Sequence, residues 1–118
     1  MIKRVSLVRR KAGLSQEAFL SHWMGPHADI VRQLPRLRGL RFGVVEHWFP
    51  QEAAWDGVGE LWFDDVADVE YAFSSEPCKS RLAEDRKVFI GDMQWCFVRE
   101  HTVLEPPANS IRHWSPFK

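Results

Sequence analysis

The sequence predicts an α+β domain in which helices cover one face of an antiparallel sheet. Three observations predict it. Some short segments alternate apolar and polar residues, as strands do, while others repeat apolar residues every three or four positions, as helices do. The third observation is their order, which is strand, helix, strand, then strand, helix, helix, strand. Two consecutive β-α-β halves are the pattern of a ferredoxin-like βαββαβ sandwich.

Size and composition limit the function classes. The 118 residues suit one domain with a real core, and 45% apolar with 27% charged residues excludes disordered and collagen-like chains. Sixteen basic and sixteen acidic residues give no net charge, so the charge balance offers little support for a nucleic-acid partner. We find no signal-peptide pattern and no run of eighteen apolar residues, and we therefore expect a cytoplasmic protein without a membrane partner.

The distribution of particular residue types is informative. Six Trp and eight Phe against one Tyr indicate either an aromatic-lined cavity or an aromatic association surface. The first eleven residues are basic, whereas Asp56 to Cys78 carries seven acids and no Lys or Arg. Such zones are solvated faces in most proteins, but they could also meet across a subunit contact. Cys78 and Cys96 have neither zinc-ligand nor disulfide-framework spacing, so we expect free, buried thiols.

The N-terminal part predicts a strand and a long helix. The strand is expected at Ile2–Arg10, and the helix runs from its N-cap residue Ser15 to about Leu34. Pro26 interrupts this helix, because proline has no N–H for the carbonyl four residues back and its ring crowds the preceding turn. We expect a kink or a break there, which would turn His27 away from an otherwise apolar surface.

The remaining elements follow from alternation and from helix signals. Strands are expected at Leu40–Phe49 and Val58–Phe63, and a last strand alternates from Met93 to Arg99. Between them, Asp64 or Asp65 caps a second helix, and a further helix begins near Pro77 and ends at about Phe89. The expected domain therefore spans residues 1–101, and residues 102–118, with three prolines and no periodicity, form an extended tail.

The sheet face away from the helices also needs a cover. Several strands are apolar on both registers, so this open face is expected to be buried. A second copy of the same sheet is the most economical cover, which predicts a homodimer.

An ordered set of motifs spans residues 3 to about 101. With these motifs the chain resembles the EthD family of the dimeric α+β barrel superfamily. The motifs are Phe19-x-x-x-Trp23-x-x-x-His27 followed by Ala28-Asp29-Ile30-Val31, Leu34-Pro35-x-Leu37, Asp56-Gly57-Val58-Gly59-Glu60-Leu61-Trp62-Phe63, Leu82-Ala83-Glu84-Asp85, and Phe89-Ile90.

The resemblance implies a homodimer in which two sheets face each other to form an α+β barrel. Each subunit would hold a small-molecule pocket between its sheet and its helices. Relatives in this superfamily include cofactor-free lactone isomerases, polyketide cyclases and dehydratases, haem-binding and haem-degrading proteins, and quinone-forming monooxygenases. EthD itself is named for a role beside a cytochrome-type monooxygenase system in ether degradation. The fold alone therefore does not determine the reaction.

Two histidines are candidate catalytic residues. Burial of His27 in an apolar pocket would favour its neutral form, able to take a proton near neutral pH, and its position matches the family's histidine. The alternative is a core histidine bonded to a backbone carbonyl. His47 shares a strand face with Val45 and Phe49, so it could project into the barrel and supply an acid, or it could lie at the surface without a role.

Other side chains are candidates for ligand binding. Glu60 could orient one of the imidazoles, and it could equally be solvated or pair across subunits. His22 and His27 are five residues apart with a proline between them, which disfavours a metal site. The sequence has no phosphate loop or dinucleotide motif, so no cofactor is expected. The aromatic residues expected to form core and pocket wall, suited to a flat, apolar ligand, are Trp23, Phe42, Trp62, Tyr71, Phe89 and Trp95.

These observations favour a cofactor-independent enzyme that acts on a small cyclic or aromatic metabolite. In this hypothesis the reaction is of the isomerase, cyclase or dehydratase type, His27 moves a proton and His47 assists. One alternative is a non-catalytic binding or accessory protein of a degradative oxygenase. Another is a haem-binding protein that uses a histidine.

Overall fold

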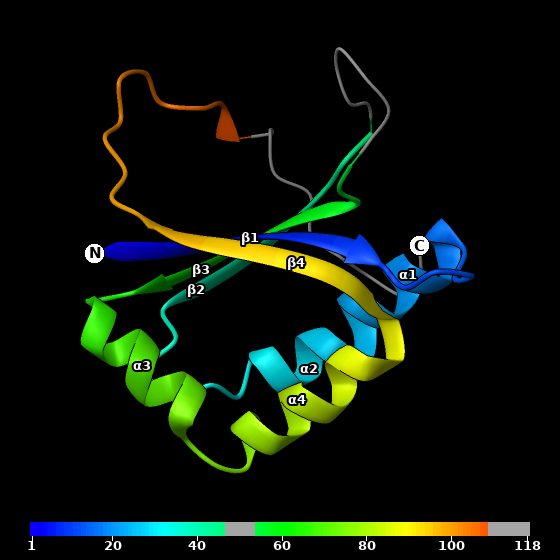
Figure 1. Ribbon diagram of the computed structural model, residues 1–118. Coiled ribbons are helices and arrows are strands. Elements are labelled where there is room, and N and C mark those ends of the chain that lie inside the picture. Colours follow the sequence, from blue (N-terminus) through cyan, green and yellow to red (C-terminus); the bar gives the residue numbers. More distant parts are fainter. Residues whose placement is uncertain (47–53, 109–118) are drawn as a thin grey trace.

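The computed structural model describes residues 1–46 and 54–108. Four strands form one antiparallel sheet in the order β2-β3-β1-β4, and the helices cover a single face of it (Figure 1). This arrangement confirms the predicted ferredoxin-like fold. The elements are β1 (Ile2–Arg10), α1 (Gln16–His22), the π-helix η1 (Trp23–His27), α2 (Ala28–Val31), β2 (Gly39–Val44), β3 (Gly57–Phe63), α3 (Val66–Ser74), α4 (Cys78–Phe89) and β4 (Ile90–Val98).

Alternation along β1 defines the two faces of the sheet. Arg4, Ser6 and Val8 are buried and point to the inner face, which the helices cover. The residues between them lie on the outer face, which carries no helix (Figure 1). Because β1 pairs with both β3 and β4, its inner residues lie at the centre of the domain.

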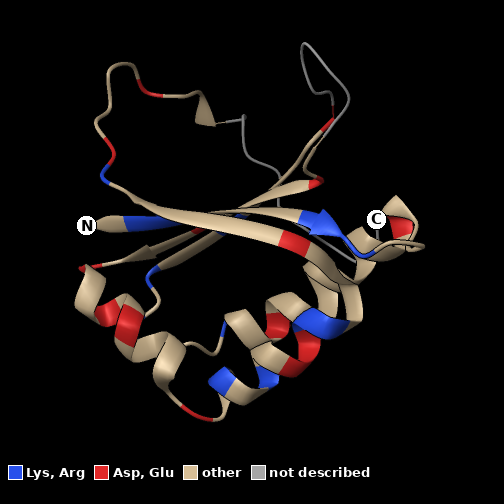
Figure 2. Cartoon of the chain, in the orientation of Figure 1, with Lys and Arg blue, Asp and Glu red and all other residues tan. Residues whose placement is uncertain are grey.

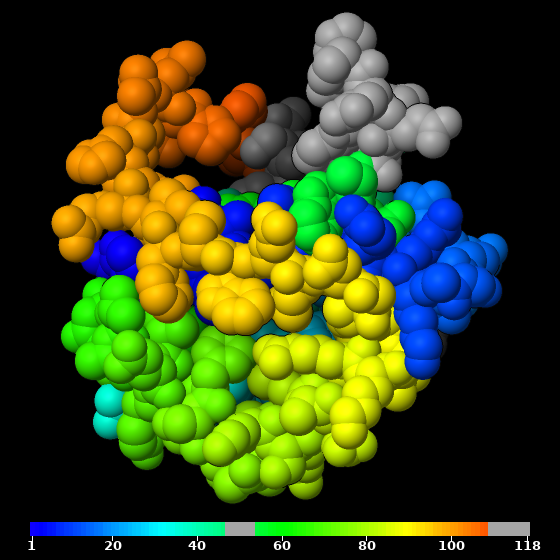
Figure 3. Space-filling model, viewed as in Figure 1, coloured from blue at the N-terminus to red at the C-terminus, as the bar shows by residue number. Residues whose placement is uncertain are grey.

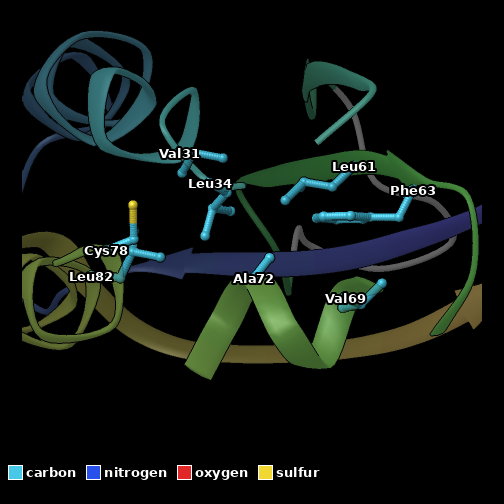
Figure 4. Packing of buried hydrophobic residues seen from close by; sticks show 8 residues of the cluster. All are labelled: Val31, Leu34, Leu61, Phe63, Val69, Ala72, Cys78 and Leu82. Atoms are coloured by element: carbon cyan, nitrogen blue, oxygen red, sulfur yellow. The ribbon is translucent and has the colours of Figure 1, made fainter. Parts of the chain in front are cut away.

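The core consists of two hydrophobic clusters between the sheet and the helices. One cluster, shown in Figure 4, joins α2, β3, α3 and α4 through residues such as Leu61, Phe63 and Leu82. The second joins β1, α1, η1 and the end of α4 through Val8, Phe19, Trp23 and Phe89. The two clusters meet beneath the middle of the sheet, where the site described below lies.

The expected irregularity at Pro26 is a π-helical turn within a helix that stays continuous, and not a break. The chain forms one π-helical turn, Trp23–His27, in which the Ala28 N–H bonds to the Trp23 carbonyl five residues back. In a π-turn the N–H groups bond to carbonyls five residues back instead of four. This change allows the helix to continue past Pro26, which has no N–H to donate. His27 therefore remains on the buried side of the helix instead of turning away from it, and 12% of its side chain is exposed.

The second strand is shorter than the sequence predicted. It ends at Val44, and Val45 and Glu46 follow it outside the sheet, with the Val45 N–H bonded to the Asp56 carbonyl at 3.0 Å. Residues 47–53 lie outside the described residues, and so does the candidate His47. The other boundaries agree closely, since Asp65 caps α3 and α4 runs from Cys78 to Phe89. Cys96 is exposed in the single chain, contrary to expectation.

The basic and acidic zones meet within one chain. Figure 2 shows Lys and Arg at both ends of β1, and β1 pairs directly with the acidic β3 region. Lys3 Nζ lies 2.6 Å from Glu60 Oε2, and the Arg10 backbone N–H donates to Asp56 Oδ2 at 2.8 Å. Antiparallel pairing of the two segments accounts for this segregation of charge without a subunit contact.

The chain beyond β4 extends on the side of the sheet away from the helices (Figure 1). Residues 99–107 form no helix or strand, and Glu100 accepts hydrogen bonds from Trp62 Nε1 and Lys3 Nζ, each at 2.9 Å. Val103 and Leu104 are almost fully exposed. Across the described ranges no helix combines the length and the apolar character needed to cross a membrane.

Candidate active site

A small cavity lies between the inner face of the sheet and the helices. Trp23 and His27 from η1 and Phe42 from β2 form part of its wall, and Arg4 and Arg86 supply charged groups. Figure 3 shows a narrow gap between the side chains of β4 and the helices below them. The free volume is about 30 Å³, which is room for only a few water molecules. A metabolite can therefore enter only if lining side chains move.

His27 and His22 are joined by one carboxylate. His27 Nδ1 lies 2.8 Å from Asp85 Oδ2, and His22 Nε2 lies 2.8 Å from Asp85 Oδ1. Because a carboxylate only accepts hydrogen bonds, both ring nitrogens donate to it. In the neutral His27 ring the proton is then on Nδ1, and the lone pair is on Nε2. Nε2 makes no hydrogen bond to any described residue, so it is free to act as a base.

The surroundings of His27 favour its neutral form. Burial lowers the pKa of His27 below its ordinary value of 6.5, and the positive charge of Arg86 acts in the same direction. The hydrogen bond to Asp85 opposes this shift but does not reverse it. The imidazole ring packs against Phe89, with 4.9 Å between ring centroids, and faces Phe42 at 6.4 Å. At neutral pH the ring is therefore an uncharged base in an apolar setting.

Aromatic residues hold this arrangement in place. Trp23 and Phe42 stack with 4.3 Å between ring centroids and 6° between ring planes. Phe89 is fully buried and contacts both imidazoles, since its centroid lies 4.7 Å from that of His22. The structure thus brings together four of the predicted site residues, Trp23, His27, Phe42 and Phe89. Phe89 packs against both histidines.

The other described candidates are not part of the cavity wall, although Trp95 lies on the same face of the sheet. Glu60 and Trp62 are on the outer face of β3, so Glu60 does not orient His27; it pairs with Lys3 instead, and Asp85 takes the expected carboxylate position. Tyr71 is 48% exposed, on α3. Trp95 is 58% exposed on β4, and the Arg4 guanidinium lies 5.2 Å from its ring centroid.

Sequence reasoning missed Asp85, His22, Arg4 and Arg86 as site residues. A signal existed in α4, because Asp85 and Arg86 follow Leu82 by three and four residues and precede Phe89, which places them on the buried side of that helix. A charged pair inside an apolar stripe is unusual and indicates a site. Among the described residues, no group of three or more His, Cys, Asp or Glu side chains is arranged to hold a metal ion.

Similar proteins support the fold assignment. An EthD family protein from Bacillus halodurans has a TM-score of 0.72 and 22% identity, covering 86% of this chain and 99% of that one. A dimeric protein with a ferredoxin-like fold from Bacteroides fragilis has a TM-score of 0.62 and 12% identity, and the match covers 84% of this chain and 95% of that one. A hydroxynitrile lyase from Passiflora edulis has a TM-score of 0.67 and 15% identity, and the match covers 88% of this chain and 96% of that one. At these identities the likeness shows the fold alone.

Comparison with curated proteins gives no significant match. The model of the EthD domain, in contrast, matches residues 11–92, which include η1, α4 and the side chains of His22, His27 and Asp85. This match covers most of the sequence, and the chain therefore belongs to the EthD family.

Proposed function

We propose that this chain is an enzyme that moves a proton on a small cyclic or aromatic metabolite without a cofactor. The reaction would be of the isomerase, cyclase or dehydratase type. The observation that carries the proposal is the hydrogen bond between His27 Nδ1 and Asp85 at the wall of a buried cavity. A carboxylate bound to one ring nitrogen fixes the tautomer and leaves the other nitrogen as the base.

In the proposed reaction, Nε2 of His27 removes a proton from an acidic C–H or O–H bond of the metabolite. The electron pair of that bond stays on the substrate, and the resulting imidazolium is stabilised by its hydrogen bond to Asp85. The same proton then returns to a different atom or goes to a leaving group, so no oxidant or reductant is needed. Such positioned proton transfer accelerates reactions by roughly 10²–10⁴-fold.

Two features of the proposal rest on sequence or on relatives. His47 is proposed as the assisting acid from its sequence position, since it lies outside the described residues. The similarity to a hydroxynitrile lyase supports a catalytic use of this fold, and the similarity to dimeric proteins supports a homodimer. In the homodimer the outer faces of two sheets would meet, leaving each cavity on the helical side of its own subunit.

The test is deuterium incorporation from D₂O into a panel of lactones, cyclic ketones and phenols, followed by mass spectrometry. His27→Gln should keep the fold and the dimer but lower exchange about 100-fold or more, because glutamine cannot accept the proton. His101→Gln is the matched control, since His101 is exposed beyond β4. Full activity in folded His27→Gln would contradict the mechanism. Retention of an apolar ligand by both proteins without any exchange would favour the non-catalytic binding protein.

A further inference from the structure

Two arginines border the cavity without an anionic partner. Arg4 lies on the inner face of β1 and is 7% exposed, and Arg86 lies on α4 and is partly buried. Within residues 1–46 and 54–108, neither guanidinium makes an ion pair or a side-chain hydrogen bond, and none of their nitrogen atoms is fully enclosed without a partner, so their N–H groups open onto the cavity or solvent. Arginines on the surface differ, since Arg36 pairs with Asp68 and Arg38 with Asp64. A largely buried guanidinium that has no anionic partner and opens onto a cavity is a place where an anion can bind.

The charges around the cavity favour an anion. Burial, reinforced by the charge of Arg86, lowers the pKa of Arg4 to about 10, so Arg4 still carries its charge at neutral pH. Two positive charges thus face the cavity, while the single negative charge of Asp85 is bound to the two histidines. An anion between the guanidiniums would offset their mutual repulsion and their burial.

The orientation of Arg4 is set by aromatic rings. Its guanidinium carbon lies 4.5 Å from the ring centroid of Phe73 and 5.2 Å from that of Trp95. Rings that contact the guanidinium restrain its orientation but take up none of its N–H donors. Ser6, two residues further along β1 on the same face, adds a hydroxyl to the cavity wall. Arg4, Arg86 and Ser6 together offer a set of donors beside the His27 base.

We propose that the ligand of this cavity is a small organic carboxylate whose carboxylate group is bound by Arg4 and Arg86. Its apolar part would lie against Trp23 and Phe42, next to His27. The planar guanidinium fork matches a carboxylate, and the mostly apolar wall suits the apolar part of an organic acid better than a free phosphate, once lining side chains move to admit it. The inference rests on the proposed function in that it takes the cavity beside His27 as the ligand site. The same arginines would stabilise the negative charge that forms when His27 removes a proton.

The experiment is an NMR titration of the full chain with benzoate, and with benzamide as its uncharged analogue. Wild type should bind benzoate more tightly than benzamide, with shifts in the Trp23 and Trp95 indole signals. Arg4→Met and Arg86→Gln should each weaken benzoate binding about tenfold or more and leave benzamide binding unchanged. Arg32→Gln is the matched control, because it removes one charge from an exposed pair with Asp29. Excess inorganic phosphate should not displace benzoate.

Several outcomes would overturn this inference. They are the absence of saturable benzoate binding to wild type, equal binding of benzoate and benzamide, displacement by phosphate, and unchanged benzoate affinity in Arg86→Gln. A purely structural Arg4 would show itself as a lower melting temperature in Arg4→Met with unchanged benzoate affinity in that same variant, which would also overturn the inference. Failure of the proposed function is distinguishable, since benzoate would still bind through the arginines while His27→Gln had no effect on proton exchange.

Discussion

Asp85 is the side chain on which the arrangement of the candidate site depends. Its two carboxylate oxygens accept from His27 Nδ1 and His22 Nε2, each at 2.8 Å, and its side chain is 11% exposed. A partly buried carboxylate with both oxygens bonded to imidazoles restrains the position of both rings. The position of the His27 ring is therefore restrained by a residue 58 positions away in the sequence.

Asp85→Asn tests this dependence. An amide can accept through its oxygen but donates through its nitrogen, so one of the two imidazoles must change its tautomer or lose its hydrogen bond. We expect turnover to fall roughly 10–100-fold with the fold retained, measured by the deuterium-exchange assay. His22→Gln is the comparison, because it leaves the bond between His27 and Asp85 in place and should have a smaller effect. A larger effect of His22→Gln than of Asp85→Asn would argue against His27 as the base.

At this scale the sequence predicted part of the site. The spacing of Trp23 and His27 placed both on one buried stripe, and the structure brings them together with Phe42. Asp85 could not be assigned, because its partners are set by the packing of α4 against η1. Glu60 was assigned to the wrong face of β3. The sequence does not distinguish the two faces clearly, because two glycines occupy the inner face, whereas the apolar Val58 and Trp62 share the outer face with Glu60.

Among the elements, β3 and η1 pack closely because Gly57 on β3 has no side chain. A Cβ atom at Gly57 would overlap the six-membered ring of the Trp23 indole, which stacks on Phe42. The glycine on β3 thus allows the π-helical turn to approach the sheet closely. The sequence predicted an irregularity at Pro26 but not its type, because a proline alone does not determine whether a helix breaks, kinks or adds a residue to its turn.

Gly57→Ala tests this close approach. The added methyl group must displace the Trp23 ring, so we expect a loss of about 1–3 kcal/mol in the free energy of unfolding, measured by denaturant titration. Gly43→Ala is the matched control on the neighbouring strand. A Cβ there would meet only ordinary contacts with Val58, at 3.8 Å and beyond, and stability should change by roughly 0.5 kcal/mol at most. Equal stability of the two variants would show that Trp23 is not held in this position.

Viewed as a whole, the molecule has one face covered by helices and one that is not (Figure 1). The outer face carries half-buried apolar residues such as Val5, Leu7 and Val58, beside the exposed Cys96. An apolar sheet face of this kind is expected to be covered, and the proposed cover is a second copy of the same face. The element order was enough to predict the fold, but the end of β2 could not be predicted, because the alternation continues in the sequence beyond the pairing with β3.

Val58→Lys tests the proposed dimer contact. A lysine on the outer face of β3, one of the two central strands, would place a charge at the interface, so we expect dissociation measured by sedimentation velocity and a lower, concentration-dependent melting temperature. Val88→Lys is the control, since Val88 is 56% exposed on α4, away from the outer face. An unchanged dimer in Val58→Lys would exclude this face as the contact.

The proposed reaction requires His27 to be a neutral base with its proton on Nδ1 and a free Nε2. The most direct measurement is a two-dimensional NMR titration of the ¹⁵N-labelled imidazoles, with His27 assigned by comparison with His27→Gln. Because burial favours the uncharged ring, the pKa of His27 should lie below 6.5, and activity should fall as the pH drops through that lowered value. We expect the Nδ1–H tautomer at neutral pH. A pKa at or above 6.5, or a proton on Nε2 at neutral pH, would contradict it.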